Sequence, residues 1–154
     1  MLTTAQLVTL KADVIANPDT NLLYTDGNLQ GLADLYNAEA LPAYTVWKTS
    51  VPTREVKTAF LWTEYIGRSA GERDAFQFML SNGVINPADA NVRQGIADIF
   101  SGPSGAQSRT NLLAIWKRNA SRLEKLFATG TGTVAAPSTM TVEGVIQYTE
   151  FIGL

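Results

Sequence analysis

The stretch Thr129-Gly130-Thr131-Gly132-Thr133 divides this sequence into two parts of different character. Before it, up to Ala128, apolar residues recur at helical spacing between residues that start and stop helices. After it, the chain is rich in the β-branched residues that favour extended structure, and it closes on an apolar run. We therefore predict a helical body over residues 1–128 and an extended, partly β-like C-terminal arm over residues 129–154.

The body has the caps and stops of about six or seven helices packed in one compact, mostly α domain. The first helix is expected to begin near Thr3 and to end before Asn17-Pro18, because the residue before proline avoids helical angles. A polar loop follows, then a helix over about 28–36 and an extended connector or short strand over 38–50. Further helices are expected to begin at Pro52-Thr53, Ser69, Asn86-Pro87, Ser104 and Asn119.

Two of these helix starts show the capping-box pattern, in which a serine and an acid or amide three residues later bond each other's backbone N–H groups. The pairs are Ser69 with Glu72 and Ser104 with Gln107. Glu124, between Arg122 and Lys125, is expected to be a surface charge.

The arm carries large apolar side chains that are costly to leave in water. It must pack on its own domain or on a neighbour, and we predict that it docks on another subunit, with Tyr148, Phe151 and Ile152 as anchors. Gly130 and Gly132 are predicted to form the hinge, because glycine adopts backbone angles that other residues resist. On this interpretation the body still folds when the chain is cut after Ala128.

The composition argues against catalysis. The chain has no cysteine and no histidine, so disulfides, thiolate chemistry and the commonest general base and metal ligand are all missing. Its carboxylates have structural roles or lie apart. We therefore predict a protein that is not an enzyme, with no catalytic residue, cofactor, metal site or small-molecule substrate. Without a basic, apolar leader or a long apolar run, no membrane is expected and the chain is predicted to be made in a cytoplasm.

Gly130-Thr131-Gly132-Thr133-Val134-Ala135 superficially matches a dinucleotide-binding fingerprint. That motif works between a strand and a following helix, whose N-terminus meets the phosphates. Here a helix precedes it and a proline-containing coil follows, so a hinge is the better interpretation.

Charge is unevenly distributed. Residues 1–40 hold one lysine against five acids, whereas residues 104–128 hold one acid, Glu124, against a basic cluster of Arg109, Lys117, Arg118, Arg122 and Lys125. The two regions could face one another within one monomer. Alternatively they could meet head to tail between copies and close a ring, with Arg118 and Arg122 at the contact.

Several segments carry a family resemblance: Thr45–Thr49, Thr63–Gly67, Val84–Pro87, Asn91–Ile96, Arg122–Gly132 and Ser138–Gly144. The series, most specific around Arg122–Glu143, resembles small structural proteins of tailed-bacteriophage virions. The architecture is also similar to head–tail connector (adaptor) proteins, small helical domains with an extended C-terminal arm that form a ring beneath the portal.

The resemblance implies a non-enzymatic virion protein in the phage neck, made in the bacterial host cytoplasm. Its expected partners are its own copies in a homo-oligomeric ring, the portal protein and tail proteins, with passive contact to passing DNA. A capsid decoration or minor tail protein is the alternative among virion roles. A small DNA-binding regulatory protein, built on the basic cluster, is the alternative of another class.

Overall fold

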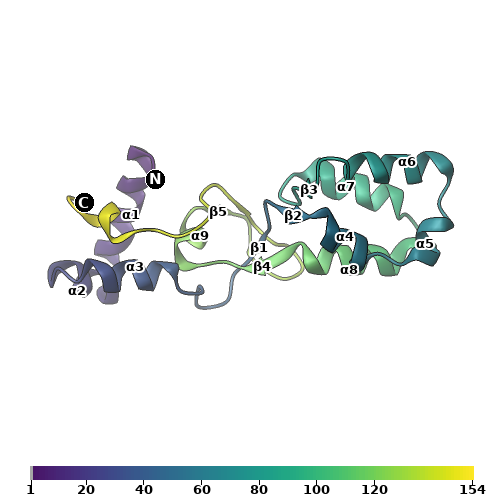
Figure 1. Ribbon diagram of the computed structural model, residues 1–154. Coiled ribbons are helices and arrows are strands. Elements are labelled where there is room, and N and C mark those ends of the chain that lie inside the picture. The colour runs from purple at the N-terminus through teal and green to yellow at the C-terminus, as the bar shows by residue number, and fades with distance from the viewer. Residues whose placement is uncertain (1) are drawn as a thin grey trace. The chain divides into compact units, whose positions relative to one another are not determined.

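The computed structural model, which describes residues 2–154, is mostly helical, as the sequence predicts (Figure 1). The chain divides into two compact units. Unit 1 combines the chain up to Val46 with Asn119–Leu154, and unit 2 is the continuous segment Trp47–Arg118. This division differs from the predicted one, because the predicted boundary at Thr129 falls inside unit 1.

Unit 1 contains the helices α1 (Thr4–Ala16), α2 (Pro18–Thr25), α3 (Leu29–Asn37) and α9 (Arg122–Leu126), and the short 3-10 helix η2 (Tyr148–Phe151). A capping box of Thr3 and Gln6 begins α1. The sequence predicts a loop where α2 lies. Pro18 starts this helix at a position that tolerates a missing N–H, and Asp19 complements the positive end of the helix dipole.

The core of unit 1 joins residues from both ends of the chain. Its buried members are Leu10, Val14, Leu32, Ala33, Tyr36, Leu123, Ile146 and Phe151. Residues of α1 and α3 thus share one core with α9 and with the arm. A smaller cluster of Val46, Ala120 and Met140 lies in the same unit.

Unit 2 contains α4 (Thr53–Ala59), α5 (Trp62–Ile66), α6 (Ala70–Met79), α7 (Ala90–Ile99), the 3-10 helix η1 (Pro103–Gly105) and α8 (Ala106–Ile115). Its core is strongly aromatic. Phe76 meets Phe60 and Phe100 edge to face, each with ring centroids 5.2 Å apart, an arrangement that adds to the stabilisation from burial.

Some helix starts agree with the sequence prediction and others do not. The Ser69–Glu72 capping box is confirmed. The single helix expected between Pro52-Thr53 and the next start at Ser69 is two helices, α4 and α5. Leu61 between them donates its N–H to Ser108 Oγ at 3.0 Å. Asp89, rather than Asn86, caps α7. The last helix is capped by Ser121, which forms its box with Glu124, and not by Asn119.

The predicted Ser104–Gln107 box is replaced by a contact from elsewhere in unit 2. The carboxylate of Glu64 accepts the N–H groups of Gln107 (3.3 Å) and Ser108 (2.8 Å) at the start of α8. Burial raises the pKa of Glu64, but these hydrogen bonds outweigh that effect and the net pKa is lowered. An acid brought from α5 thus satisfies backbone donors that the local sequence leaves open.

The strands are short and paired two by two. β1 (Thr45–Trp47), in the region where the sequence predicts a connector or strand, pairs with β4 (Lys117–Asn119). β2 (Val51–Pro52) pairs antiparallel with β3 (Val84–Ile85). β5 (Ala128–Thr129) pairs antiparallel with β6 (Thr139–Met140), so the arm is partly β, as predicted.

The arm packs on its own unit, whereas the sequence led us to predict docking on another subunit. Figure 1 shows the yellow C-terminal segment running beside α3. Phe151 is 0% exposed and its ring lies 5.7 Å from that of Tyr36. The amide side chain of Asn37 donates to the carbonyl of Ile146 (2.9 Å) and accepts its N–H (2.8 Å). An apolar tail must be buried against some protein surface. The sequence alone does not show whether that surface belongs to the same chain or to another subunit.

Gly130 and Gly132 occupy a tightly packed turn. Both have positive φ, 129° and 65°. A Cβ on Gly132 would lie 2.1 Å from the ring of Tyr44, and one on Gly130 would lie 2.7 Å from Ser138 Oγ. Tyr44 also donates its hydroxyl to the carbonyl of Gly130 at 2.9 Å. The two glycines therefore serve close packing of the arm, in addition to supplying backbone angles that other residues resist.

Replacing Phe151 by alanine is expected to lower the free energy of unfolding by about 3–5 kcal/mol, because it empties a fully buried aromatic site. The neighbouring Ile152→Ala removes a side chain that is 64% exposed and is expected to change stability by at most ~0.5 kcal/mol. Chemical denaturation measures both. Equal, small losses of stability in the two variants would show that the arm is not part of the core, which is what the sequence predicts for an arm that docks on another subunit.

Gly132→Ala is expected to cost roughly 2–5 kcal/mol, since it adds a collision with Tyr44 to an unfavourable φ. Gly27 provides a matched control: its φ is 71° and a Cβ there meets nothing within 4 Å. Gly27→Ala is therefore expected to cost only the backbone term, ~1–2 kcal/mol. If the two variants melt alike, the contact with Tyr44 contributes nothing.

Candidate functional site

A groove of about 660 Å³ lies in unit 1. Its walls come from the end of α1 and the start of α2, from the end of α3 with the residues after it, and from α9. The volume falls in the range of sites that hold a ligand or an inserted side chain. Apolar side chains, among them Leu35 and Leu126, line it between charged residues.

The position of α9 places two cations on the groove. The Ser121–Glu124 capping box starts this helix and Leu123 is buried in the core. Arg122 and Lys125, three residues apart on one helix, then lie on the same side, and both line the groove. Lys125 also lies over the ring of Tyr44, with its Nζ 5.7 Å from the ring centroid.

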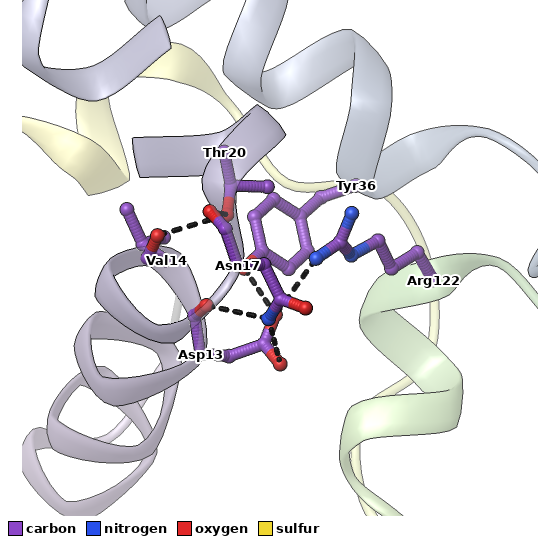
Figure 2. A network of polar contacts seen from close by, with 6 residues as sticks. All are labelled: Asp13, Val14, Asn17, Thr20, Tyr36 and Arg122. Carbon is purple, nitrogen blue, oxygen red and sulfur yellow. Dashed lines mark hydrogen bonds and ion pairs between the residues drawn. The ribbon is translucent and has the colours of Figure 1, made fainter. Parts of the chain in front are cut away.

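A polar network, drawn in Figure 2, shares Asp13, Asn17 and Arg122 with the lining of the groove. Tyr36 donates its hydroxyl to Asp13 Oδ2 at 2.5 Å, and Arg122 Nη2 lies 3.3 Å from the same oxygen. The guanidinium of Arg122 also covers the ring of Tyr36 at 5.0 Å. Three side chains from α1, α3 and α9 thus meet at one carboxylate oxygen.

Neighbouring hydrogen bonds hold Asp13 in place. Asn17 Nδ2 donates to the backbone carbonyl of Asp13 at 2.7 Å and to its Oδ1 at 3.0 Å. The buried hydroxyl of Thr20 donates to the carbonyl of Val14 at 2.9 Å. These contacts fasten the turn between α1 and α2, so the carboxylate that faces Tyr36 and Arg122 is preorganised (Figure 2).

Burial raises the pKa of Tyr36 above its usual value, and the hydrogen bond to Asp13 and the negative charge of that carboxylate raise it further. The nearby charge of Arg122 opposes this shift without cancelling it. The hydroxyl therefore keeps its proton over the physiological range and donates a hydrogen bond to Asp13. This arrangement is typical of a structural contact.

Glu124, expected from the sequence to be a surface charge, is 3% exposed. Its carboxylate accepts the N–H of Ser121 at 2.9 Å and the N–H of Gly144 in the arm at 3.1 Å. The sequence pattern Ser121-x-x-Glu124 is a capping box and could have revealed the first contact. The second joins residues distant in the sequence and has no local signal.

The basic cluster is divided between the two units. Arg109, Lys117 and Arg118 belong to unit 2, whereas Arg122 and Lys125 belong to unit 1. Arg109 donates to the carbonyls of Phe100 and Gly102, and Lys117 lies 5.5 Å from the ring centroid of Trp47. Arg118 is half-buried in β4 and has its own contacts.

Of the two explanations for the charge asymmetry, the contact within one chain holds for Arg122, which pairs with Asp13 of the same unit.

Among the predicted arm anchors, Phe151 is buried in the core of unit 1. Tyr148 and Ile152 remain exposed at the surface.

Residues 2–154 contain no group of three or more histidine, cysteine, aspartate or glutamate side chains that could hold a metal ion. In the same residues, no helix combines the length and apolar character needed to cross a bilayer.

Comparison with known proteins adds no relative: no protein family, no curated protein and no solved structure matches this chain.

The raised pKa of Tyr36 predicts a pH dependence. A tyrosine whose folded-state pKa is raised gives its full stabilisation below the unfolded-state pKa of about 10, and this is lost as the pH rises from there toward the folded-state pKa. We expect the free energy of unfolding to fall above about pH 10 by up to ~1.4 kcal/mol per pH unit more than in Tyr36→Phe.

Denaturation curves at successive alkaline pH values measure this difference. Tyr148→Phe, which alters an exposed tyrosine of the same unit, is the control and is expected to retain the slope of the wild type. A Tyr36→Phe protein whose stability falls with pH as steeply as the wild type would show that Tyr36 is not the responsible group.

Proposed function

We propose that this protein is a non-enzymatic structural component of a tailed-bacteriophage virion, a head–tail connector (adaptor) that forms a ring between the portal and the tail. The proposal begins from the sequence resemblance described above. The most specific part of that resemblance, Arg122–Glu143, covers α9, β5 and β6. This segment includes the antiparallel pairing of β5 with β6 at the start of the arm.

The single observation that carries an assembly role is an exposed apolar surface on unit 2, formed by Leu61, Trp62 and Ile66 and called here the α5 surface. Trp62 is 63% exposed. Trp62 and Ile66 are four residues apart on α5 and so share one side of the helix. Exposed tryptophan with aliphatic neighbours is characteristic of protein contact sites, where tryptophan often dominates the binding energy.

The α5 surface is rigidly supported. The ring of Trp62 lies 5.2 Å from that of Tyr65, which is itself buried in the aromatic core of unit 2. Arg68 then ties the end of α5 to the segment that leads into η1 and to η1 itself, donating to the carbonyls of Ser101 (3.2 Å) and Ser104 (2.9 Å). A preorganised apolar surface loses little entropy on binding, which suits a permanent subunit contact.

In the proposed mechanism, copies pack side by side through helical surfaces such as the α5 surface. The arm contributes less than the sequence analysis expected, because most of it is used inside unit 1. Its exposed apolar side chains, among them Val145, Tyr148 and Ile152, are left to touch the portal or a tail protein. The ring would be held by the bodies of the subunits, with the arm lending a secondary contact.

A DNA-binding role receives no specific support. Four of the five cations on which it would rest have contacts within their own units: Arg109 with backbone carbonyls, Lys117 with Trp47, Arg122 with Asp13, and Lys125 with Tyr44. A decoration or minor tail protein would use an apolar surface in the same way as an adaptor, and it differs only in its partner.

Native mass spectrometry of the protein, alone and with a candidate portal protein, tests this role. We expect a closed ring or a portal complex, and we expect Trp62→Ala to weaken assembly by ~30-fold or more, as for a hot-spot residue. Phe78→Ala, an exposed aromatic on α6 outside the α5 surface, is the matched control and should assemble normally.

Two results would contradict the proposal. One is a protein that neither forms a ring nor binds the portal or tail proteins of the phage that encodes it. The other is tight DNA binding that falls steeply with salt concentration, the signature of phosphate neutralisation.

A further inference from the structure

Asn82-Gly83 is the one place in the sequence where a glycine follows an asparagine. The pair lies in the turn between α6 and β3 of unit 2, and both residues are exposed, as is Ser81 before them. Gly83 has a φ of 77°, and a Cβ added there would meet no atom within 4 Å. The carboxamide of Asn82 is therefore followed by a backbone nitrogen that no side chain shields.

Neither of these two groups is held tightly. Among residues 2–154, none is a hydrogen-bond partner of the Asn82 side chain. The N–H of Gly83 donates to the carbonyl of Leu80 at 3.4 Å, which is beyond the usual N–H···O range of about 2.7–3.2 Å. Because glycine adopts many backbone angles at low cost, the nitrogen of Gly83 can turn toward the side-chain carbonyl carbon of Asn82.

We propose that Asn82 is a site of spontaneous covalent modification, at which a cyclic imide forms and is then hydrolysed to aspartate and isoaspartate. The nitrogen of Gly83 attacks Cγ of Asn82. A C–N bond forms, the bond from Cγ to Nδ2 breaks, and ammonia leaves with the amide proton. Water, the only co-reactant, then opens the ring. Opening at Cγ yields aspartate, and opening at the backbone carbonyl carbon yields isoaspartate, whose main chain runs through Cβ and Cγ.

The other asparagines lack this combination of features. None of them precedes a glycine, so a larger residue crowds the attacking nitrogen. Asn21 and Asn91 lie within α2 and α7, where the helical backbone keeps the next nitrogen away from the side-chain carbon. Hydrogen bonds hold the remaining side chains, which are those of Asn17, Asn28, Asn37, Asn86, Asn111 and Asn119.

The position of the turn makes the isoaspartate form structurally costly. The carbonyl of Gly83 accepts the N–H of Thr53 at 3.0 Å, at the start of α4, and Val84 pairs with Pro52 between β3 and β2. Isoaspartate adds one carbon to the main chain directly before these contacts and so displaces their register. Aspartate leaves the main chain unchanged and adds only a negative charge.

Peptide mapping by mass spectrometry, on folded protein sampled during incubation at neutral and mildly alkaline pH, tests the proposal. We expect Asn82 to exchange its NH2 for OH and to give both products. The rate is expected to be at least about ten-fold higher than at any other asparagine, which corresponds to a barrier lower by about 1.4 kcal/mol. Asn82→Gln is the matched variant. It is expected to stay unmodified at this position, because its longer side chain must close a larger and less favourable ring.

Asn82→Asp separates the added charge from the altered main chain. This variant is expected to melt like the wild type, because residue 82 is exposed. The isoaspartate form, purified by chromatography from aged protein, is expected to melt at least about 3 °C lower, as for the loss of a backbone hydrogen bond.

Protein incubated in denaturant gives the reaction rate of the unstructured chain. An Asn82 that stays intact in the folded protein while the denatured chain converts it overturns the proposal, because the turn then protects the site. Equal conversion at several asparagines of the folded protein also overturns it. An isoaspartate form that melts like Asn82→Asp contradicts the displacement of β3. The reaction needs no partner and no assembly, so each of these results is obtained on the isolated protein.

Discussion

The carboxylate of Asp13 is the constraint on which unit 1 depends. It receives the hydroxyl of Tyr36 and lies against the guanidinium of Arg122, so that α1, α3 and α9 meet at one group. Removing a single partner from such a partly buried cluster leaves an uncompensated charge, which costs more than the pair itself contributes. The groove exists because these three helices are held at this junction.

The same junction determines which surfaces remain for partners. Arg122 forms an ion pair with Asp13 of its own chain, and Glu124 accepts a hydrogen bond from the N–H of Gly144 in the arm. The charged residues and the tail that first indicate assembly are therefore largely engaged in contacts within one chain. Apolar side chains remain exposed, among them those of the α5 surface on unit 2. Assembly through such surfaces would be driven by burial, with charge setting orientation.

The sequence predicts well what is local. The mostly helical class, the Ser69–Glu72 capping box and the strand near Val46 all follow from neighbouring residues, and all are present. The sequence fails to predict a contact when the partner residue lies far away in the chain. Glu64 caps α8 in place of Ser104, Tyr44 packs against Gly132, and Asn37 holds Ile146. Each of these joins residues far apart in the chain, and no spacing within a helix or turn encodes them. The groove belongs to the same class, because its walls come from separate segments.

The interrupted course of unit 1 bears on how the protein is made. Unit 2 is one continuous segment and can fold as soon as it leaves the ribosome, since domains generally fold as units during synthesis. Unit 1 must wait, because its core needs Phe151 and its groove needs α9. The first helices of the chain therefore cannot complete their core until the segment that carries Phe151 has been synthesised. Until then their apolar faces stay open to water and to chaperones, while unit 2 is already folded.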